Sequence, residues 1–339
     1  MLIELSSELL PSGARLLHDD DFCAAMDHLL DAHRYGQHAV VMDREVIAWL
    51  EGASLSRRSR GALKHLRERV FQYPSLLRRV REHLLVVAAD QDRVAWSGPV
   101  CRVPWRWFVP PTSTSPTRLI GEQVDRDVTV YHAFASALLA ESGLLAALSG
   151  QGGGGSSTGA NLKNEALKSQ IVLAVVDSDR ESEQHRAGDT SWAAIKAASE
   201  VGARRDPADQ SADRPKVPVQ QHDKAIARLI VLQVRELENL IPAELWRLAL
   251  KAPDYLSQLE SLAQQGLLGE GRGRWVDLKA SPHRLVGKDQ DALKLLAEVL
   301  SQDPRPDPLA YFPLSAHPEL ARVVHTIAEW GLASPPLRT

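Results

Sequence analysis

The chain carries Ile171-Val-Leu-Ala-Val-Val-Asp-Ser-Asp179, in which six consecutive apolar residues lead directly into two carboxylates. A short apolar run rich in β-branched residues and bounded by polar ones is typical of a strand buried on both faces, as in a parallel sheet. Asp177 and Asp179 therefore follow the C-terminal end of a strand, where open α/β sheets bind ligands. Two carboxylates so close together repel each other unless a cation joins them, and a hard divalent metal is the natural partner.

The composition is that of a folded protein with room for two or three domains. The chain has 339 residues, 44% hydrophobic and 24% charged, and a formal net charge of −3, which argues against a protein that coats nucleic acid through overall positive charge. Cys23 and Cys101 are too few for a disulfide framework or a cysteine-based zinc site and suit a reducing compartment. The sequence shows neither an apolar run of about 18 residues nor a signal-peptide pattern. We therefore expect a cytoplasmic protein with no membrane partner.

Residues 1–110 are expected to form an N-terminal α/β segment. Strands are predicted over 38–42 and 84–89, and the basic, amphipathic stretch 56–81 between them is expected to form two helices divided near Pro74. A solvated helix face is the favoured interpretation of this stretch, and a phosphate-binding surface is the alternative. Trp105-Arg-Trp-Phe108 is expected to pack in the interior, with stacking on nucleic-acid bases as the alternative.

Pro110-Pro-Thr-Ser-Thr-Ser-Pro116 has the composition of a linker, so a second domain is predicted over residues 117–245. Hydrophobic spacing predicts strands over 118–122 and 228–234 and helices over 127–139 and 190–201, the latter with Asp189 as N-cap. Residues 203–224 are expected to form an exposed loop. Residues 246–339 are predicted to be mainly helical, clearest over 291–300 and 318–330, with a brief extended segment over 274–279.

Gly150-Gln-Gly-Gly-Gly-Gly-Ser-Ser-Thr-Gly159 is a low-complexity segment that follows a predicted helical stretch over 144–148. Because Gly159 is not followed by Lys and Ser or Thr, the segment does not fit a Walker-type nucleotide site. A flexible loop is the favoured interpretation. A backbone-amide clamp for a DNA phosphate is the alternative.

Acidic residues follow three of the predicted strands. They are Glu122, the pair Asp177 and Asp179, and the pair Glu236 and Glu238. Because the C-terminal ends of parallel strands lie on one edge of a sheet, these side chains are expected to converge. A cluster of carboxylates suits Mg²⁺ or Mn²⁺, which are hard, oxygen-seeking ions.

The ordered set of Leu-Ile-Gly-Glu122, Asp177-Ser-Asp179 and Glu236-Leu-Glu-Asn239 resembles the TOPRIM superfamily, the topoisomerase–primase metal-binding fold. In layout it is most similar to overcoming-lysogenization-defect type nucleases and to TOPRIM-like proteins of bacterial defence systems. The resemblance covers residues 117–245 and implies a mostly parallel sheet flanked by helices. It also implies a metal held by Glu122, Asp177, Asp179, Glu236 and Glu238, and a downstream lysine near it, for which Lys279 is the candidate. The glycine-rich segment and the insertion at 203–224 depart from the minimal fold.

The leading hypothesis is a Mg²⁺-dependent nuclease that hydrolyses phosphodiester bonds, with DNA as the favoured substrate and anti-phage defence as the implied setting. Glu122, Asp177, Asp179 and Lys279 are its predicted catalytic residues. One alternative is a non-catalytic subunit that binds nucleic acid or nucleotide and works with a separate ATPase. The other is a haloacid-type phosphatase with Asp177 as nucleophile, which is disfavoured because Glu122 precedes the acidic pair.

Histidines add little to this prediction. His132 is expected to serve packing or the surface, and proton transfer by His185 is the weaker of its interpretations.

Overall fold

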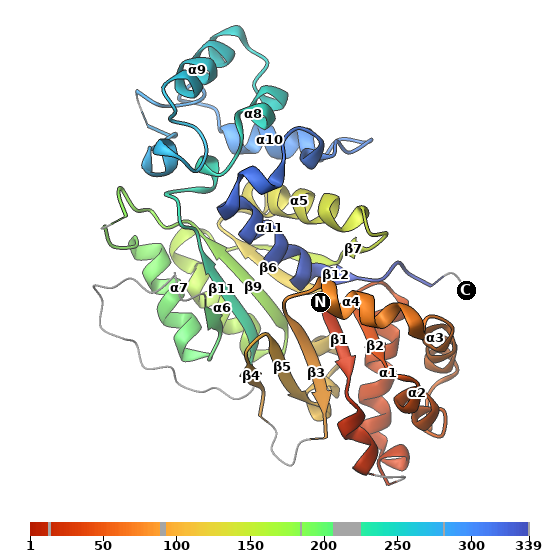
Figure 1. The fold of residues 1–339 in the computed structure, drawn as a ribbon. Helices are drawn as coiled ribbons and strands as arrows, with labels where there is room; N and C mark the ends of the chain where they lie inside the picture. Colours follow the sequence, from red (N-terminus) through yellow and green to blue (C-terminus); the bar gives the residue numbers. More distant parts are fainter. Residues whose placement is uncertain (13–14, 89–92, 184, 206–224, 281, 338–339) are drawn as a thin grey trace.

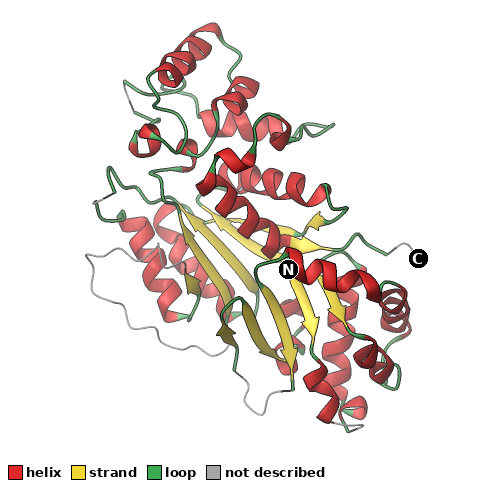
Figure 2. Cartoon of the chain, in the orientation of Figure 1, coloured by secondary structure: helices red, strands yellow, loops and turns green. Residues whose placement is uncertain are grey.

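The computed structural model describes the chain except at residues 13–14, 89–92, 184, 206–224, 281 and 338–339 (Figure 1). Within the described residues the strands form two five-stranded sheets and one two-stranded pair, and helices flank the sheets (Figure 2). In the two large sheets the described pairings are parallel, apart from that of β4 with β5. The predicted α/β class with mostly parallel sheets flanked by helices is confirmed.

The first sheet is built from the N-terminal third of the chain. Its strands, in spatial order, are β2 (Ala39–Met42), β1 (Leu2–Leu5), β3 (His83–Val87), β5 (Val100–Pro104) and β4 (Ala95–Ser97). The helices of this part are α1 (Asp20–Arg34), α2 (Arg44–Leu50), α3 (Arg57–Glu68) and α4 (Tyr73–Arg79). The predicted strands at 38–42 and 84–89 correspond to β2 and β3, although Ala89 lies outside the described residues. The basic stretch forms two helices as predicted, and Pro74 lies in the first turn of α4.

The second sheet follows the turn Pro111–Thr114. Its strands, in spatial order, are β10 (Arg204–Arg205), β11 (Ile226–Val231), β9 (Ile171–Val176), β6 (Thr117–Gly121) and β8 (Leu148–Gly152). Its helices are α5 (Thr129–Ala140), α6 (Thr158–Leu167) and α7 (Asp189–Glu200). Every residue of β9 and β11 is buried, which explains why β9 is a continuous apolar run and why β11 is apolar apart from Arg228, whose side chain pairs with Glu82.

The C-terminal part is mainly helical, as predicted. Its helices are α8 (Ala243–Ala249), α9 (Pro253–Gln264), α10 (Ala292–Leu300) and α11 (Pro318–Gly331), and β12 (Leu332–Ala333) pairs antiparallel with β7 (Leu145–Ala146). Helices α8, α9 and α10 stand beyond one end of the second sheet, whereas α11 packs against α5 (Figure 1). None of the helices in the described residues is long and apolar enough to cross a membrane.

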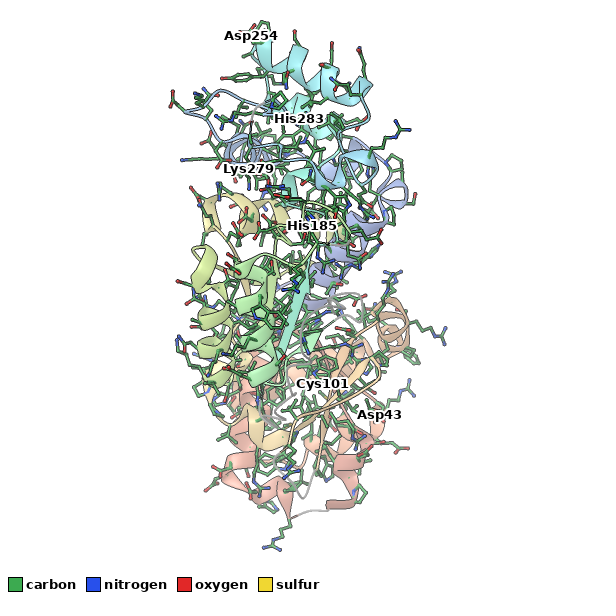
Figure 3. All side chains as sticks on the ribbon, turned by 90° about the vertical axis from the view of Figure 1, so that its left-hand side faces the viewer. Asp43, Cys101, His185, Asp254, Lys279 and His283 are labelled. Atoms are coloured by element: carbon green, nitrogen blue, oxygen red, sulfur yellow. The ribbon has the colours of Figure 1, made fainter. Side chains whose placement is uncertain are left out.

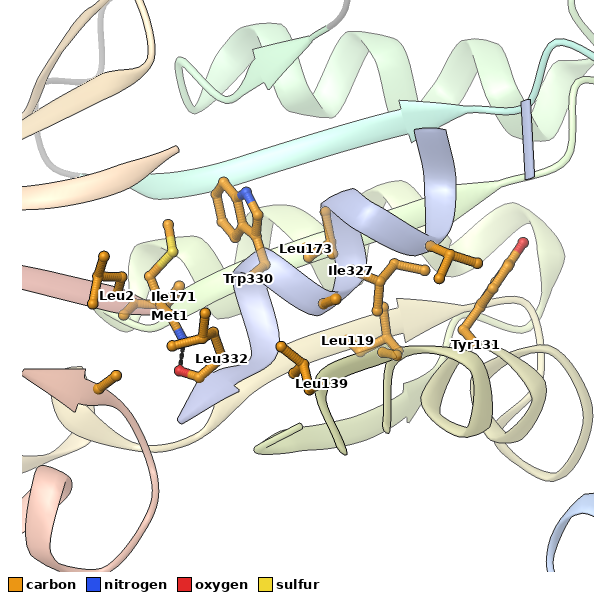
Figure 4. Packing of buried hydrophobic residues seen from close by; sticks show 14 of the residues in the cluster. Met1, Leu2, Leu119, Tyr131, Leu139, Ile171, Leu173, Ile327, Trp330 and Leu332 are labelled. Atoms are coloured by element: carbon orange, nitrogen blue, oxygen red, sulfur yellow. Dashed lines mark hydrogen bonds between the residues drawn. The ribbon is translucent and has the colours of Figure 1, made fainter. Parts of the chain in front are cut away.

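The two large sheets share one hydrophobic core, because α11 and β12 return to the N-terminus (Figure 4). The amino group of Met1 donates to the carbonyl oxygen of Leu332, and the Thr117 hydroxyl donates to that of Trp330. The Trp330 indole N–H donates in turn to Glu82 at 3.0 Å. Contacts near the two chain termini therefore connect the two sheets. The predicted domain boundary between residues 110 and 117 stays a prediction.

Several local predictions were wrong where tertiary packing overrode local composition. Residues 144–148 and the first glycines of the glycine-rich segment form β7 and β8 instead of a helix and a flexible loop. Gly150 explains this, since a Cβ atom there would lie 2.8 Å from Cγ1 of Val128. The absent side chain therefore lets β8 approach the turn that follows β6.

Three further expectations need correction. Residues 274–279 are not extended: residues 274–275 end the 3₁₀ helix Arg272–Trp275, and residues 276–279 continue as an irregular segment and a turn. Gly188, not Asp189, is the N-cap of α7. Arg204–Arg205 form a short strand, whereas the rest of the predicted loop at 206–224 lies outside the described residues.

The aromatic cluster after β5 belongs to the interior, as favoured. Trp105, Trp107 and Phe108 are buried, and the Trp105 ring meets that of Phe22 edge to face at 5.3 Å between centroids. The alternative of stacking on bases is wrong, because buried rings cannot reach a nucleic acid.

Candidate functional site

Topology brings the predicted acids to one edge of the second sheet. Strands β6, β9 and β11 are neighbours and parallel, so the residues after them emerge at the same edge. The chain leaves β6 toward β8 on one side and then crosses to β9 on the other. Such a reversal opens a crevice between the two strands, and ligands of open α/β sheets bind there. Glu122 follows one of these strands and Asp177 the other.

Asp177 is the most buried member of the strand-end pair. Its Oδ1 accepts the backbone N–H of Leu237 at 3.0 Å, which connects the ends of β9 and β11. Burial raises the pKa of Asp177 well above its ordinary value; nearby Lys279 opposes this shift, and the charges of Glu238 and Glu122 add to it. The anionic form of this buried carboxyl is therefore unfavourable unless a proton or a further cation neutralises it.

Asp179 is held in a tight turn by backbone contacts. Its φ of 55° lies in the left-handed region, and the N–H groups of Ser178 and Asp179 donate to the Arg235 carbonyl oxygen at 3.1 and 3.0 Å. Gly188 packs directly on it, since a Cβ atom there would lie 2.6 Å from the Cβ and Oδ2 atoms of Asp179. Desolvation raises the pKa of Asp179, against the nearby positive charge of Lys279.

Glu122 lies between β6 and the glycine-rich turn. Its carbonyl oxygen accepts the N–H of Gly154 at 2.9 Å, so the backbone of the two strand ends is joined there. Partial burial raises the pKa of Glu122, with Lys279 lowering it and Asp179 raising it. These influences place Glu122 in the same electrostatic group as the Asp177 and Asp179 pair.

Glu236 and Glu238 are both buried in the turn after β11. The Glu236 N–H donates to Oδ1 of Asn239 at 3.0 Å, and the Asn239 amide donates to the carbonyl oxygens of Gly273 and Val276, each at 2.9 Å. Asn239 thereby fixes the turn that presents the glutamates. Burial and the charge of Glu238 raise the pKa of Glu236 to about 7.

Lys279 lies among these acids, as the resemblance implied. Its Nζ is 3.2 Å from Oε1 of Glu238 and 3.5 Å from Oε2 of Glu236. Burial alone would lower the pKa of Lys279, but the surrounding carboxylates, Glu238 and Asp177 foremost, raise it above its ordinary value. Figure 3 shows Lys279 between the end of the second sheet and the C-terminal helical part. Its ammonium group therefore neutralises part of the acidic cluster.

The sequence prediction missed Asp127 and the arginines around the cluster. Asp127 is buried, accepts the Gln123 N–H at 2.7 Å, and has its pKa raised by burial to about 6. Arg126 forms an ion pair with Asp291, and Arg235 pairs with Asp277 at 2.9 Å. The sequence signal for Asp127 was its position five residues after Glu122, in the turn that precedes α5.

A cavity of about 230 Å³ adjoins the acids and has a basic wall. It is lined by Glu238, Leu278, Lys279, Arg284, Val286, Lys288, Gln290, Asp291 and Ala292. Lys279, Arg284 and Lys288 lie on it together with Glu238, so positive charge stands directly beside the carboxylates. This arrangement suits a substrate that carries negative oxygens.

The donor set fits a hard divalent cation. All the candidate ligands are carboxylates, and the Oε2 atoms of Glu236 and Glu238 are buried without a hydrogen-bond partner among the described residues. Across the described part of the chain, no three His, Cys, Asp or Glu side chains are already arranged around a metal position. Glu122, Asp177, Asp179, Glu236 and Glu238 thus supply suitable oxygens, and Lys279 supplies the positive charge near them.

The two histidines singled out from the sequence, His132 and His185, make polar contacts outside the acidic cluster. His132 Nδ1 is 3.3 Å from the Ser136 hydroxyl on α5, and His185 Nδ1 is 3.7 Å from Glu181 in the turn after β9.

Comparisons of this chain with protein-family models, with curated proteins and with solved structures find no match.

Proposed function

We propose that this chain is a divalent-metal-dependent nuclease of the TOPRIM type, which hydrolyses phosphodiester bonds, with DNA as the favoured substrate. The observation that carries the proposal is the meeting of acids from three neighbouring parallel strands at a reversal of strand order. Two of the buried carboxylate oxygens there lack hydrogen-bond partners within the described residues. Buried oxygens without hydrogen bonds are costly to keep, and positive charge offsets this cost; Lys279, 3.5 Å from Oε2 of Glu236, supplies part of that charge, and a bound cation would supply the rest.

In this proposal the carboxylates of Glu122, Asp177, Asp179 and Glu238 hold Mg²⁺ or Mn²⁺. The metal would supply Lewis acidity and charge neutralisation for transfer of the phosphoryl group. Lys279, with Arg284 beside it on the cavity wall, would bind the oxygens of the scissile phosphate.

Proton transfer at the site also falls to its carboxyl groups. Glu236, whose pKa is raised to about 7, is placed to accept and return a proton near neutral pH. Glu122 is a second candidate for this task, because it stands at the edge of the cluster and is only partly buried. Work with a separate ATPase and a role in anti-phage defence extend the proposal on the strength of the sequence resemblance alone.

The test is nicking of supercoiled plasmid DNA with Mg²⁺ or Mn²⁺ by the wild type and by Asp179→Asn. Asparagine tolerates the left-handed backbone of residue 179, so the variant keeps the turn while losing the charge. We expect its nicking rate to fall at least about 100-fold. The matched control is Asp43→Asn, which changes another acid placed after a parallel strand; its rate should equal that of the wild type. Equal nicking by the wild type and Asp179→Asn would reject the proposal.

One observation favours a second candidate, a non-catalytic subunit that binds nucleic acid or nucleotide. Lys279 already provides a positive charge within 3.2 Å of Glu238 and 3.5 Å of Glu236. Calorimetric titration with Mn²⁺ separates the two functions. Binding of the ion by the wild type and its loss in Asp179→Asn supports the nuclease, and absence of binding by the wild type supports the second candidate.

The structure offers no support for the phosphatase alternative. Asp177 is 9% exposed, and its Oδ1 is held by the Leu237 N–H. A carboxylate that is buried and bound in this way is poorly placed to attack a phosphate.

A further inference from the structure

A cavity of about 440 Å³ opens on the N-terminal part of the molecule, away from the acidic cluster. It lies along α3 and is lined by Arg34, Arg57, Arg58, Gly61, Ala62, Lys64, His65, Glu68 and Leu337. Four of these side chains are permanently cationic, whereas Glu68 is the one carboxylate among them. In a chain with a formal net charge of −3, this is a local concentration of positive charge.

Among the described residues, the cations of this cavity form no structural ion pairs. Within the described residues no carboxylate lies within ion-pair distance of Arg57, Arg58 or Lys64. Nη1 of Arg34 is buried and, among the same described residues, has no hydrogen-bond partner. The C-terminal segment fixes Arg34 in place, since the Leu337 N–H donates to the Arg34 carbonyl oxygen at 2.9 Å. Unpaired buried guanidinium nitrogens are costly, and an anion would satisfy them.

The position of two of these arginines adds a second argument. Arg57 and Arg58 occupy the first turn of α3, which contains no acidic residue. Positive side chains there oppose the positive end of the helix dipole and destabilise the free helix. An anion bound at this end would interact favourably with both the side chains and the dipole.

The positive surface continues into a second cavity of about 240 Å³, which shares His65 with the first. Arg69 and Arg79 line it, and Arg79 Nη1 donates to the Ser142 hydroxyl at 3.1 Å. Ser142 follows α5, so the row of basic side chains extends from α3 to a helix that flanks the second sheet. A track of six basic residues over two cavities that share His65 matches a ligand with repeated negative charges better than one with a single phosphate.

We propose that this track, formed by Arg34, Arg57, Arg58, Lys64, Arg69 and Arg79, binds the phosphodiester backbone of a polynucleotide. Binding there requires neither the acidic cluster nor a divalent metal. The ligand class is that of the proposed nuclease, but the surface and its test are independent of cleavage.

The experiment measures fluorescence anisotropy of a short labelled DNA duplex in EDTA, so that no cleavage occurs. The test variant is Arg57→Gln/Arg58→Gln. The matched control is Arg60→Gln/Arg67→Gln, which removes the same charge from the same helix at positions that line neither cavity; Arg67 instead pairs with Glu51 at 2.7 Å. Thermal unfolding of each variant verifies that it is folded.

We expect the test variant to bind the duplex roughly tenfold more weakly and to have a salt dependence smaller by about 2 in log–log slope. The control should keep the wild-type affinity. Equal losses in both variants, or none in either, would overturn the proposal, because binding would then not depend on the track. Preferential loss of binding to phosphatidylserine vesicles or to free ATP, with DNA binding unchanged, would also overturn it.

The result is separable from that of the nicking experiment. If the wild type never nicks plasmid but the test variant loses DNA binding, the track stands and the nuclease proposal fails. If Asp179→Asn abolishes nicking while both arginine variants bind DNA as the wild type does, the track fails and the nuclease stands.

Discussion

The two large sheets have the same strand order but carry different side chains at their edges, and the outermost strand β4 is antiparallel to its neighbour whereas its counterpart β10 is parallel. Counting strands along the chain within each sheet, both have the spatial order second, first, third, fifth, fourth. In the second sheet the first strand, β6, is followed by Glu122, whereas in the first sheet β1 is followed by Ser6. The third strand of the first sheet, β3, is followed directly by Ala88, and residues 89–92 lie outside the described part. A shared strand order therefore provides an edge, and the side chains placed on it decide whether the edge is a site.

The acids of the two sheets also differ in what they do. Asp43 follows β2 of the first sheet and caps α2 by accepting the Val46 N–H at 2.8 Å (Figure 3). Glu82, which precedes β3, is buried yet fully engaged, since it accepts from Trp330 and pairs with Arg204 at 2.9 Å and with Arg228. The edge acids of the second sheet are less fully engaged, since Glu236 and Glu238 share the ammonium group of Lys279 and each keeps a buried Oε2 without a hydrogen bond among the described residues. The comparison teaches that a buried carboxylate indicates a site when its structural partners are too few.

The largest change in the free energy of unfolding should come from Glu82→Ala, which removes a buried carboxylate held by several partners. The substitution leaves the guanidinium groups of Arg204 and Arg228 without this partner at the junction of the sheets. Removing one member of a buried ion pair costs about 3 to 5 kcal/mol. Urea denaturation should show a loss of that size in the free energy of unfolding. A loss below about 1 kcal/mol would mean that Glu82 is no better engaged than the edge acids.

Glu329→Gln tests a second buried carboxylate at the junction of the sheets, through the pH dependence of stability. Burial raises the pKa of Glu329 from 4.5 to about 7. The hydrogen bond from the Arg81 N–H, which Glu329 accepts at 3.0 Å, opposes this shift in pKa, as do the charges of Arg81 and Arg228. The charge of Glu82 adds to it. The folded state thus keeps a proton that the unfolded chain releases, so wild-type stability falls as pH rises from about 5 through 7.

Glutamine removes this titration but keeps the acceptor for Arg81. Denaturation at several pH values should show a flatter profile and a gain of roughly 2 to 3 kcal/mol at pH 8 relative to the wild type. A variant with the wild-type slope between pH 5 and 8 would place the titration on another group.

Asp177→Asn should stabilise the metal-free protein, whereas Glu82→Ala should destabilise it. Asparagine can still accept the Leu237 N–H, while one negative charge leaves a cluster that includes Glu122 and Glu238. The gain in unfolding free energy in EDTA at pH 8 should be about 1 to 2 kcal/mol. Destabilisation by this variant would show that Asp177 serves the fold as Glu82 does.

Asp43→Ala should give the smallest effect. Loss of the N-cap of α2 costs about 1 kcal/mol, and Mn²⁺ binding measured by calorimetry should be unchanged. Asp43→Asn, which retains a capping side chain, serves as its control and should be close to neutral. Loss of Mn²⁺ binding in Asp43→Ala would contradict the distinction between capping acids and edge acids.

The sequence by itself determined the α/β class and the order of acids on the edge. Continuous apolar runs such as that of β9 predict buried parallel strands, and parallel strands direct the residues after them to one side. The grouping of Glu122 with the Asp177 and Asp179 pair followed from this local rule alone. Identification of β1, β4 and β5 did not follow, because polar residues interrupt their apolar runs, with Glu4 in β1, Ser97 in β4 and Arg102 in β5.

Tertiary structure decided the features that depend on residues distant in the sequence. Gly150 became part of a strand because Val128 leaves no room for a side chain there. Lys279 reached Glu238 through a turn that local pattern predicted to be extended. The basic track required the C-terminal Leu337 to close on Arg34. Hydrophobic periodicity reports only whether a residue is buried, so which groups meet is decided when the separate segments pack.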